Sequence, residues 1–259
     1  MSAPIIRFEG VHKAFGSQVV LDDLTVDLAA GETTVIMGPS GVGKSVFLKL
    51  LVGLLQPDRG RIWINDVDIT VSKESELRNV RKRLGMLFQD GALFDSMTVG
   101  ENVAFPIRRH TKMKEPEIRE VVANRLQQVG LPDTGDKMPS ELSGGMRRRV
   151  GLARAIVLDP EIVLFDEPTT GLDPVTSDSI DRLISRMKQE LGITFVVISH
   201  DIVGTFRIAD RIGMLYKGRL IAYGTPDQVR HSQDPVLRRF LGRNLQLPPA
   251  GPQRAAEQT

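Results

Sequence analysis

Eight consecutive residues near the start of the chain have the types and spacing of a phosphate-binding loop. The pattern G-x-x-x-x-G-K-[ST] is matched by Gly38, Pro39, Ser40, Gly41, Val42, Gly43, Lys44 and Ser45. Its glycines let the backbone turn tightly and bring N–H groups close to phosphate oxygens, and the helix that follows favours the same anion. In such a loop the lysine reaches the β- and γ-phosphates, and the next hydroxyl ligates Mg²⁺. The sequence therefore predicts a nucleotide phosphate site that ends on Val46.

Two adjacent acids have the position that such a site requires for its metal and its water. Asp166 directly follows four apolar residues, 162–165, and Glu167 comes next. An apolar strand that ends in Asp is typical of the second motif of nucleotidases, whose carboxylate holds Mg²⁺. An acid just beyond the strand end can act as general base for an attacking water. We expect Asp166 to be the metal ligand and Glu167 the base. The alternatives are an ordinary strand-end acid and a structural carboxylate.

A second anion site is predicted much further along the chain. Leu142, Ser143, Gly144 and Gly145 precede a helical run that begins with Met146. Ser143 is a favourable N-cap, and two glycines expose backbone N–H groups at the amino end of the helix. A purely structural cap explains the serine alone, but not four such residues followed by arginines. The chain therefore carries two segments that can bind phosphate.

The elements that must position these residues alternate between strand and helix in most of the chain. Apolar runs predict strands at 5–9, 19–28, 33–37, 61–65, 84–88, 162–165 and 194–198, and a hairpin at 211–216 and 219–223. Apolar residues at helical spacing predict helices at 46–51, 72–83, 115–129, 146–158 and 175–191, with short helices near 227–231 and 235–241. Strand patterns are missing between residues 90 and 160, which predicts a helical insertion in an α/β core.

Composition limits the classes of protein that this chain can represent. Its 259 residues include 34 basic and 32 acidic side chains, so the net charge of +2 gives little support to a broad nucleic-acid-binding surface. The absence of cysteine excludes disulfides and cysteine-based zinc sites. The first residues lack the apolar core of a signal peptide, and no apolar run approaches the ~20 residues that span a bilayer. We therefore expect a soluble, cytoplasmic protein that binds no nucleic acid.

Six segments in a fixed order resemble the nucleotide-binding subunits of ATP-binding cassette (ABC) transporters, over about residues 5–242. They are residues 38–45, Gln89, 142–145, 162–167, 171–174 and 199–201. The resemblance implies an α/β fold with a P-loop NTPase (RecA-like) core, an N-terminal antiparallel β subdomain and a helical subdomain inserted at about 90–160. It assigns residues 1–245 to the ABC ATPase domain and leaves 246–259 as a disordered tail. The implied cofactors are ATP and Mg²⁺, and the implied activity is ATP hydrolysis.

The resemblance also assigns roles to single positions. Phe15 matches the aromatic residue that stacks on adenine, and Gln89 matches the glutamine that touches Mg²⁺ or the water. His200 matches the histidine that bonds the γ-phosphate, and Asp173 matches a loop that crosses the seam between two subunits. The implied catalytic residues are Lys44, Gln89, Glu167 and His200. The implied metal ligands are Ser45, Gln89 and Asp166.

The resemblance also implies a homodimer, through the second anion site. Ser143, Gly144 and Gly145 match the family's signature, which binds the γ-phosphate held by the opposite subunit. The resemblance therefore implies that two chains pair head to tail and close two ATP molecules in their seam. Opening and closing of the seam would drive an integral-membrane permease on another chain. Two departures are mild: Met146 stands where glutamine is commoner, and Phe15 stands where many relatives have tyrosine.

Residues 87–106 discriminate most within the family. This stretch resembles the ATPases of the phospholipid-trafficking (Mla) and MCE-associated ABC systems of diderm bacteria. The implied partners are a permease, an MCE-domain lipid-binding protein and a small regulatory subunit. The implied location is the cytoplasmic face of the inner membrane, as a peripheral subunit. Within the stretch, Leu93, Phe94, Met97 and Phe105 could line a groove for a permease helix, or could simply pack the helical insertion.

Other functions stay open at this point. An ABC ATPase for another cargo, such as amino-acid import or lipophile efflux, would have the same core. A soluble ABC ATPase acting on ribosomes or DNA usually carries two cassettes or a long coiled-coil insertion, and this sequence has neither. A GTP-binding switch would need an Asn-Lys-x-Asp segment, which is absent. A catalytically silent scaffold is disfavoured because Lys44, Asp166, Glu167 and His200 are all in place.

Overall fold

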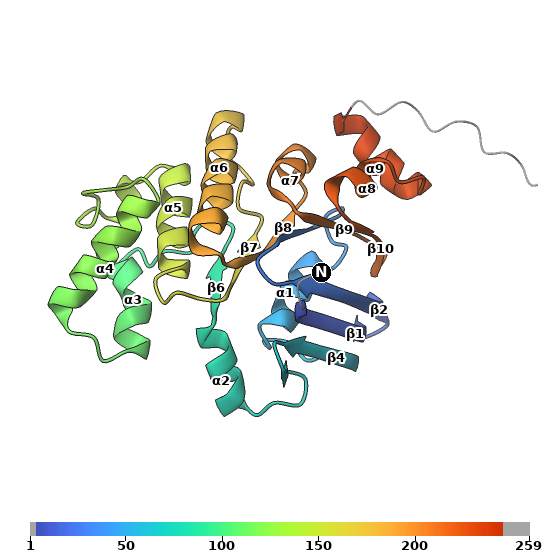
Figure 1. Ribbon diagram of the computed structural model, residues 1–259, viewed down its shortest axis with the longest axis horizontal. Coiled ribbons are helices and arrows are strands. Elements are labelled where there is room, and N and C mark those ends of the chain that lie inside the picture. Colours follow the sequence, from blue (N-terminus) through green and yellow to red (C-terminus); the bar gives the residue numbers. More distant parts are fainter. Residues whose placement is uncertain (1–3, 246–259) are drawn as a thin grey trace, which may run out of the picture.

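The computed structural model describes residues 4–245, in which two sheets are joined by helices (Figure 1). The larger sheet has the strand order β10-β9-β3-β8-β7-β6. Its parallel strands are β3 (Thr33–Met37), β6 (Leu84–Leu87), β7 (Ile162–Asp166), β8 (Thr194–Ser199) and β9 (Arg211–Tyr216). The edge strand β10 (Arg219–Gly224) runs antiparallel to β9. The carboxyl ends of the parallel strands meet at one edge of the sheet, where ligands bind in open α/β folds.

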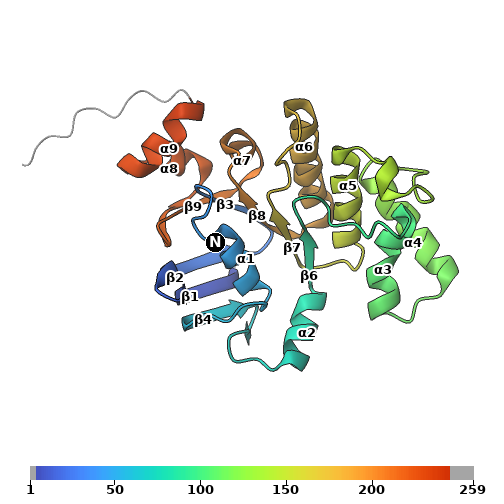
Figure 2. The same ribbon diagram turned by 180° about the vertical axis from the view of Figure 1, so that it is seen from behind.

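The smaller sheet is antiparallel and lies beside α1 (Figure 2). Its order is β2-β1-β4-β5, with β1 (Pro4–Phe15), β2 (Gln18–Ala29), β4 (Arg59–Ile64) and β5 (Val67–Asp68). Phe8 of β1 stacks on Phe47 of α1 (Lys44–Leu51), with 4.5 Å between ring centroids. The predicted antiparallel N-terminal subdomain is therefore present, and it packs against the helix that carries Lys44.

The buried strands β7 and β8 divide the core into two layers. Val163, Phe165 and Val197 belong to the apolar cluster shared with the helices α3 (Val99–His110), α4 (Glu115–Gln128), α5 (Gly144–Ala155) and α6 (Pro174–Leu191). Leu164 and Val196 belong to the cluster shared with α1 and the small sheet. Successive side chains of a strand point to opposite faces, so a continuous apolar run is needed when both faces are covered. This explains why residues 162–165 and 194–198 form unbroken apolar runs in the sequence.

The other regular elements of residues 4–245 are helices. Those around the parallel sheet are α1, α2 (Glu74–Lys82), α6 (Pro174–Leu191), α7 (Ile202–Ile208), α8 (Pro226–Arg230) and α9 (Pro235–Leu245). Between β6 and β7 the chain forms α3 (Val99–His110), α4 (Glu115–Gln128), a 3₁₀ turn (Pro139–Glu141) and α5 (Gly144–Ala155). Within residues 4–245, no helix is both long and apolar enough to cross a bilayer.

The segment between β6 and β7 contains no strand, and α3, α4 and α5 gather beyond the β6 edge of the sheet (Figure 1). The apolar faces of these helices, which carry Val103, Val122 and Val150, form one cluster with the near face of the sheet. We propose that residues 90–160 form the predicted helical subdomain and that the predicted N-terminal domain ends near residue 245. The predicted tail, 246–259, lies outside the described residues.

Several predicted boundaries were wrong, for identifiable reasons. β1 continues to Phe15 because a bulge near Gly10, with φ +58°, interrupts the alternation that defines a strand in sequence. Helix α5 begins at Gly144, directly after its Ser143 cap, and ends at Ala155 rather than residue 158. The helices α3 and α7 and the short β5 were not predicted. Pro106 inside α3 masks its helical pattern, although the capping box of Thr98 and Glu101 marks its start.

Candidate functional site

The phosphate loop connects the carboxyl end of β3 to the first turn of α1. Gly38, Gly41 and Gly43 have φ values of +157°, +76° and +109°, which favour glycine. A Cβ on Gly38 would lie 2.3 Å from the carbonyl oxygen of Leu215, and one on Gly43 would lie 3.0 Å from that of Val20. These two glycines are therefore needed for close packing as well as for their backbone angles. The loop is held between β2 and β9.

Lys44 is buried at the floor of this loop. Its ammonium donates to the carbonyl oxygens of Gly38 at 2.8 Å and Pro39 at 3.1 Å, and lies 3.7 Å from Oε1 of Glu167. Only 7% of the residue is exposed, so the positive charge stays within the loop and faces the carboxylate. This arrangement fits an anion site with a fixed cation at its base. The contact of Lys44 with β- and γ-phosphates stays a prediction.

Glu167 is the first residue after β7 and is held from several directions. Its N–H donates to Ile198 O at 3.0 Å, and its Oε2 accepts from the Thr170 hydroxyl at 3.1 Å and the His200 backbone N–H at 3.2 Å. Nδ1 of His200 lies 2.7 Å from the same Oε2 atom. The φ of Glu167 is +51°, a strained angle for a non-glycine residue. These contacts hold the strained residue with its carboxylate between Lys44 and His200.

Asp166 is the last residue of β7 and is partly buried. Burial raises the pKa of its carboxyl, the neighbouring Glu167 charge raises it further, and Lys44 opposes both. A cation beside Asp166 would stabilise its charged carboxylate. A hydroxyl, a carboxylate and phosphate oxygens are the donors that Mg²⁺ prefers. Ser45 and Asp166 therefore fit a metal that is held jointly with a nucleotide. In residues 4–245 no cluster of three His, Cys, Asp or Glu side chains could hold a metal alone.

A cavity of about 410 Å³ opens over the phosphate loop. Its lining combines parts of three predicted motifs with one residue that was not predicted, Val20. The lining residues are Phe15, Val20, Ser40, Gly41, Gly43, Lys44, Ser45, Val46 and Glu167. The structure thus brings the adenine-stacking candidate, the phosphate loop and the candidate base to one cavity, although they come from β1, the β3–α1 loop and the end of β7.

Phe15 stands at the rim of this cavity with 48% of its surface exposed. The backbone before it is fixed by Asp58, whose carboxylate accepts from the Ala14 N–H at 2.7 Å and from the Lys13 ammonium at 2.7 Å. The Lys13 ammonium also lies 5.5 Å from the centroid of the Phe15 ring. An aromatic face held in place and open to solvent is suited to stacking on a planar base.

Gln89 lies in the turn after β6 and is exposed. Leu87 of β6 pairs with Phe165 of β7, and Gln89 and Glu167 each follow two residues after this pair. The register therefore supports a place for Gln89 beside the two acids. Its contact with metal or water stays a prediction.

The second anion segment lies outside the phosphate cavity. The Ser143 hydroxyl accepts from the Met146 N–H at 3.3 Å and so caps α5. Asp173 caps α6 by accepting from the N–H groups of Val175 and Thr176, each at 3.0 Å. A Cβ on Gly145 would lie 2.6 Å from Cγ2 of Thr176, so the two caps pack against each other. Ser143, Gly144, Gly145 and Asp173 line none of the phosphate cavity within one chain.

Part of the predicted groove between the helical insertion and the sheet is present. A cavity of about 310 Å³ is lined by Phe88, Phe94 and Phe105, together with residues of α2, β6 and α5. Phe94 and Phe105 contact each other with ring centroids 5.0 Å apart, and each is about 40% exposed (43% and 39%). Leu93 and Met97 do not line this groove. Leu93 packs against the core instead, which is the alternative stated for these residues, so the groove interpretation fits only Phe94 and Phe105.

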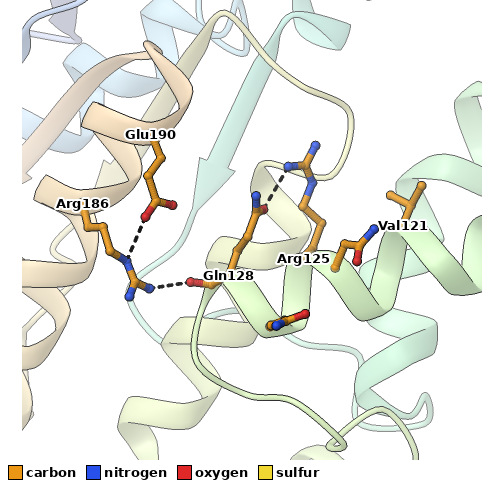
Figure 3. A pocket seen from close by; sticks show the side chains of 7 residues that line it. Val121, Arg125, Gln128, Arg186 and Glu190 are labelled. Atoms are coloured by element: carbon orange, nitrogen blue, oxygen red, sulfur yellow. Dashed lines mark hydrogen bonds and ion pairs between the residues drawn. The ribbon is translucent and has the colours of Figure 1, made fainter.

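A larger cavity, of about 570 Å³, contains none of the predicted site residues. It lies between α4 and α6 (Figure 3). Its charged groups are already paired: Arg186 binds Glu190 at 3.6 Å, and Arg125 donates to the Gln128 side chain at 3.0 Å. Cavity size alone would therefore have indicated a different site from the one that the motifs predict.

The family model described as "ABC transporter" matches residues 21–170, which span the phosphate loop, the groove, the signature and both acids. The chain belongs to the ABC transporter family. As a member of this family, the chain is an ABC cassette that binds and hydrolyses ATP. Its fold, with the parallel sheet and the antiparallel N-terminal sheet, confirms the predicted P-loop NTPase architecture.

Curated relatives cover nearly all of this cassette. It is 47% identical to a probable ribonucleotide transport ATP-binding protein, mkl, of Mycobacterium leprae, over 93% of this chain and 70% of that protein. It is 45% identical to the intermembrane phospholipid transport system ATP-binding protein MlaF of Haemophilus influenzae, over 93% of this chain and 91% of that protein. The MlaF of Escherichia coli K12 is 41% identical, over 92% and 89%.

Solved ABC cassettes share this fold closely. A dimeric structure of the ATP-binding cassette MJ0796, in a post-hydrolysis state bound to ADP and Pi, has a TM-score of 0.78 at 30% identity and covers 85% of this chain and 98% of its own. The cbiO1 protein from Clostridium perfringens, part of the cbiONQ transporter complex, has a TM-score of 0.82 at 31% identity and covers 95% and 97%. This chain therefore has the fold of solved ABC cassettes.

Proposed function

We propose that this cassette is the ATPase of a phospholipid transporter in a diderm bacterium and that it powers lipid movement between the two membranes. The observation that carries the proposal is its 45% identity with MlaF over about nine-tenths of both chains. The stretch 87–106, which resembles the phospholipid-trafficking ATPases, forms the turn after β6, the aromatic groove and the first part of α3. The part that would meet a permease is thus the part that carries the resemblance.

In this proposal Glu167 is the general base. Its carboxylate takes a proton from the attacking water. His200 would bond the γ-phosphate, and its 2.7 Å contact to Oε2 also holds the Glu167 carboxylate. Lys44 and the loop N–H groups bind the phosphates, and Phe15 stacks on adenine. Ser45, Asp166 and Gln89 would hold Mg²⁺, which supplies charge neutralisation for the phosphates. Residues 38–46 provide the remaining contacts to the nucleotide.

The signature would act across a homodimer. Ser143, Gly144 and Gly145 offer a helix amino end but lie outside the phosphate cavity of their own chain, so a second chain must supply the phosphate that they bind. Asp173 caps α6 beside the signature and would cross the same seam. The dimeric cassette MJ0796 supports this arrangement by analogy. Two composite sites per dimer follow from the two-fold symmetry.

The partners belong to the same proposal. The groove lined by Phe88, Phe94 and Phe105 would receive a permease helix, because exposed aromatic side chains flanking a groove suit an amphipathic helix. An MCE-domain lipid-binding protein and a small regulatory subunit would complete the transporter. The cassette would then be peripheral, at the cytoplasmic face of the inner membrane.

A second cargo class is favoured by one observation. The mkl relatives are named for probable ribonucleotide transport and are 47% identical to this chain. The residues that bind and hydrolyse ATP are indifferent to cargo, because the cargo passes through the permease. Amino-acid import or lipophile efflux would use the same cassette. The cargo must therefore be tested through the partners.

The test uses the Glu167→Gln chain, tagged and expressed in its native host. This variant should bind ATP without turnover and so keep the complex closed. Membranes extracted in mild detergent would be used for a pull-down, with bound proteins, lipids and nucleotides identified by mass spectrometry. The Lys44→Ala chain, which should not hold the phosphates, is the matched control.

Each result has a defined meaning. A permease with an MCE-domain protein and co-purified phospholipid supports the proposal. Recovery of a permease with a ribonucleotide, an amino-acid-binding protein or an efflux partner would support the role as transport ATPase. It would overturn the lipid cargo. Recovery of the chain without any membrane protein would overturn the proposal that it powers a membrane transporter.

A further inference from the structure

Arg148 joins three segments of the candidate site. It lies in the second turn of α5, and only 4% of its surface is exposed. Its Nη2 donates to the Thr170 carbonyl oxygen at 2.8 Å and to Oδ1 of Asp90 at 3.2 Å. Its Nη1 would lie 3.9 Å from a Cβ placed on Gly144. One guanidinium therefore touches the loop after β7 and the turn after β6, and it lies beside the signature.

The turn after β6 is fastened to α5 by more than this one contact. Gly91 has φ +78°, and a Cβ on it would lie 2.7 Å from the Arg147 carbonyl oxygen. The Arg154 guanidinium donates to Gly91 O at 2.7 Å and to Ala92 O at 2.8 Å. The turn that begins at Gln89 is thus packed on the signature helix at close range, and a displacement of one must be felt by the other.

On the other side, the contact leads directly to the candidate base. Thr170, whose carbonyl accepts from Arg148, donates its N–H to Glu167 O at 3.2 Å and its hydroxyl to Glu167 Oε2 at 3.1 Å. Asp90, Arg148, Thr170 and Glu167 therefore form a continuous series of hydrogen bonds. The series runs from the residue next to Gln89 to the carboxylate that faces Lys44.

The chemistry of Arg148 indicates a purpose for its burial. Loss of water lowers the pKa of its guanidinium, the Asp90 charge opposes this, and its buried Nε atom has no hydrogen-bond partner. A buried charge with an unpartnered donor costs free energy, so a neutral residue at this position would serve stability at least as well. A planar guanidinium does allow one nitrogen to bind Thr170 and Asp90 together in fixed geometry.

We propose that Arg148 is a positioning residue for ATP hydrolysis. It fixes the Thr170 loop relative to the Gln89 turn, and through Thr170 it fixes the carboxylate of Glu167. The proposal rests on the proposed role of Glu167 as the base. Through Arg148, the turn that begins at Gln89 beside the aromatic groove would influence the rate of hydrolysis.

The test measures steady-state ATP hydrolysis and nucleotide binding by the purified full chain. Arg148→Gln should lower kcat about tenfold or more, because small displacements of a reacting group have large effects on rate. KM and the Kd for ATP should change less than about twofold, since Arg148 does not line the phosphate cavity. Thr170→Val, which keeps the side-chain shape, should lower kcat in the same way. The double variant should be little worse than either single variant.

Two controls separate positioning from stability. Arg125→Gln alters another largely buried arginine that pairs with an acid, Asp159, away from the site, and should leave kcat unchanged. Asp90→Asn alters an exposed carboxylate, 83% accessible, so it should fold normally and lower kcat in part. Glu167→Gln is measured in parallel to test the base independently.

The outcomes are distinct. An unchanged kcat in folded Arg148→Gln, or independent and additive effects of Arg148→Gln and Thr170→Val, would overturn the proposal. A parallel loss of kcat, ATP affinity and thermal stability would assign Arg148 a structural role only, which also overturns it. Substantial turnover by Glu167→Gln would remove Glu167 from the role of base, a failure of the proposed function that is visible separately.

Discussion

Nδ1 of His200 lies 2.7 Å from Oε2 of Glu167, and the backbone N–H of His200 donates to the same oxygen at 3.2 Å. The two residues are 33 positions apart, but each follows a strand of the same parallel pair, since Asp166 of β7 is paired with Ile198 of β8. One carboxylate oxygen is thus held by the histidine, and Oε1 is left facing Lys44. This division of the carboxylate leads to the first two predictions.

Replacing Glu167 by Gln should abolish ATP turnover and preserve ATP binding. The amide is nearly isosteric but cannot take a proton from water, and general-base catalysis contributes typically about 10²–10⁴-fold to rate. Phosphate release should therefore fall by about 100-fold or more, while ATP affinity measured by calorimetry stays similar. Turnover near that of the unaltered chain would remove Glu167 from this role.

Replacing His200 by Ala should release the Glu167 carboxylate from its orientation and slow hydrolysis. The side chain of Glu167 would keep its bond to Thr170 and could turn toward Lys44, which is 3.7 Å from Oε1. We expect kcat to fall by about tenfold or more, because a misdirected base is a poor base. Single-turnover phosphate release is the measurement. Val203→Ala, an exposed position on the next helix, is the control that should leave the rate unchanged.

Replacing Phe15 by Ala should weaken nucleotide affinity without changing the rate of the chemical step. Stacking of a base on an aromatic side chain is worth about 1–3 kcal/mol, so the Kd for ATP should rise by roughly 5- to 150-fold. Phe15→Tyr keeps the ring and should bind ATP as before. Equal affinities of the Ala and Tyr variants would show that Phe15 does not stack on the base.

Mixing two inactive variants should restore part of the ATPase activity if the sites are shared between chains. In a dimer of Lys44→Ala with Ser143→Glu, one site combines an intact phosphate loop with an intact signature. Activity should therefore appear on mixing, measured as phosphate release against mixing ratio. The matched control mixes Lys44→Ala with Glu167→Gln, in which both sites are damaged and no activity should appear. Equal behaviour of the two mixtures would contradict a site built across the seam.

Asp181 should make stability depend on pH. It is buried in α6, 3% exposed, and burial raises the pKa of its carboxyl to about 6, against the attraction of Arg207 and with repulsion from Asp201 and Asp178. A raised pKa means that the native state binds the proton more tightly than the unfolded chain does. The favourable contribution is present below about pH 4 and is lost as pH rises to about 6.

Asp181→Asn removes this titration, so it should gain stability relative to the unaltered chain as pH rises from about 4 to about 7. The carboxyl pKa is raised from 3.8 to about 6, and each tenfold change in proton affinity is worth about 1.4 kcal/mol, so the gain should be about 3 kcal/mol. Urea unfolding at several pH values is the measurement. Asp178→Asn alters the more exposed partner of Arg207 and leaves Asp181 titrating, so its stability difference from the unaltered chain should vary less with pH. A stability difference that is constant with pH would contradict the prediction.

The sequence by itself determined the local chemistry of this protein. The order of glycines before Lys44, the apolar run before Asp166 and the Ser143 cap are short-range patterns, and each requires a particular turn, strand end or helix start. Together with the apolar periodicity and the family resemblance, these patterns predicted the α/β core, the helical insertion and every residue that lines the phosphate cavity except Val20. They failed where a long-range constraint intervened, as at Gly10, where a bulge hides the continuation of β1.

Only the tertiary structure decided which distant residues touch. The parallel register of β7 and β8 brings His200 to Glu167, and Asp58 fixes the backbone that presents Phe15. The link from Asp90 through Arg148 to Thr170 spans residues that are 58 and 22 positions apart, so no spacing rule could reveal it. Side-chain contacts across elements depend on packing and strand order, which local sequence does not encode position by position.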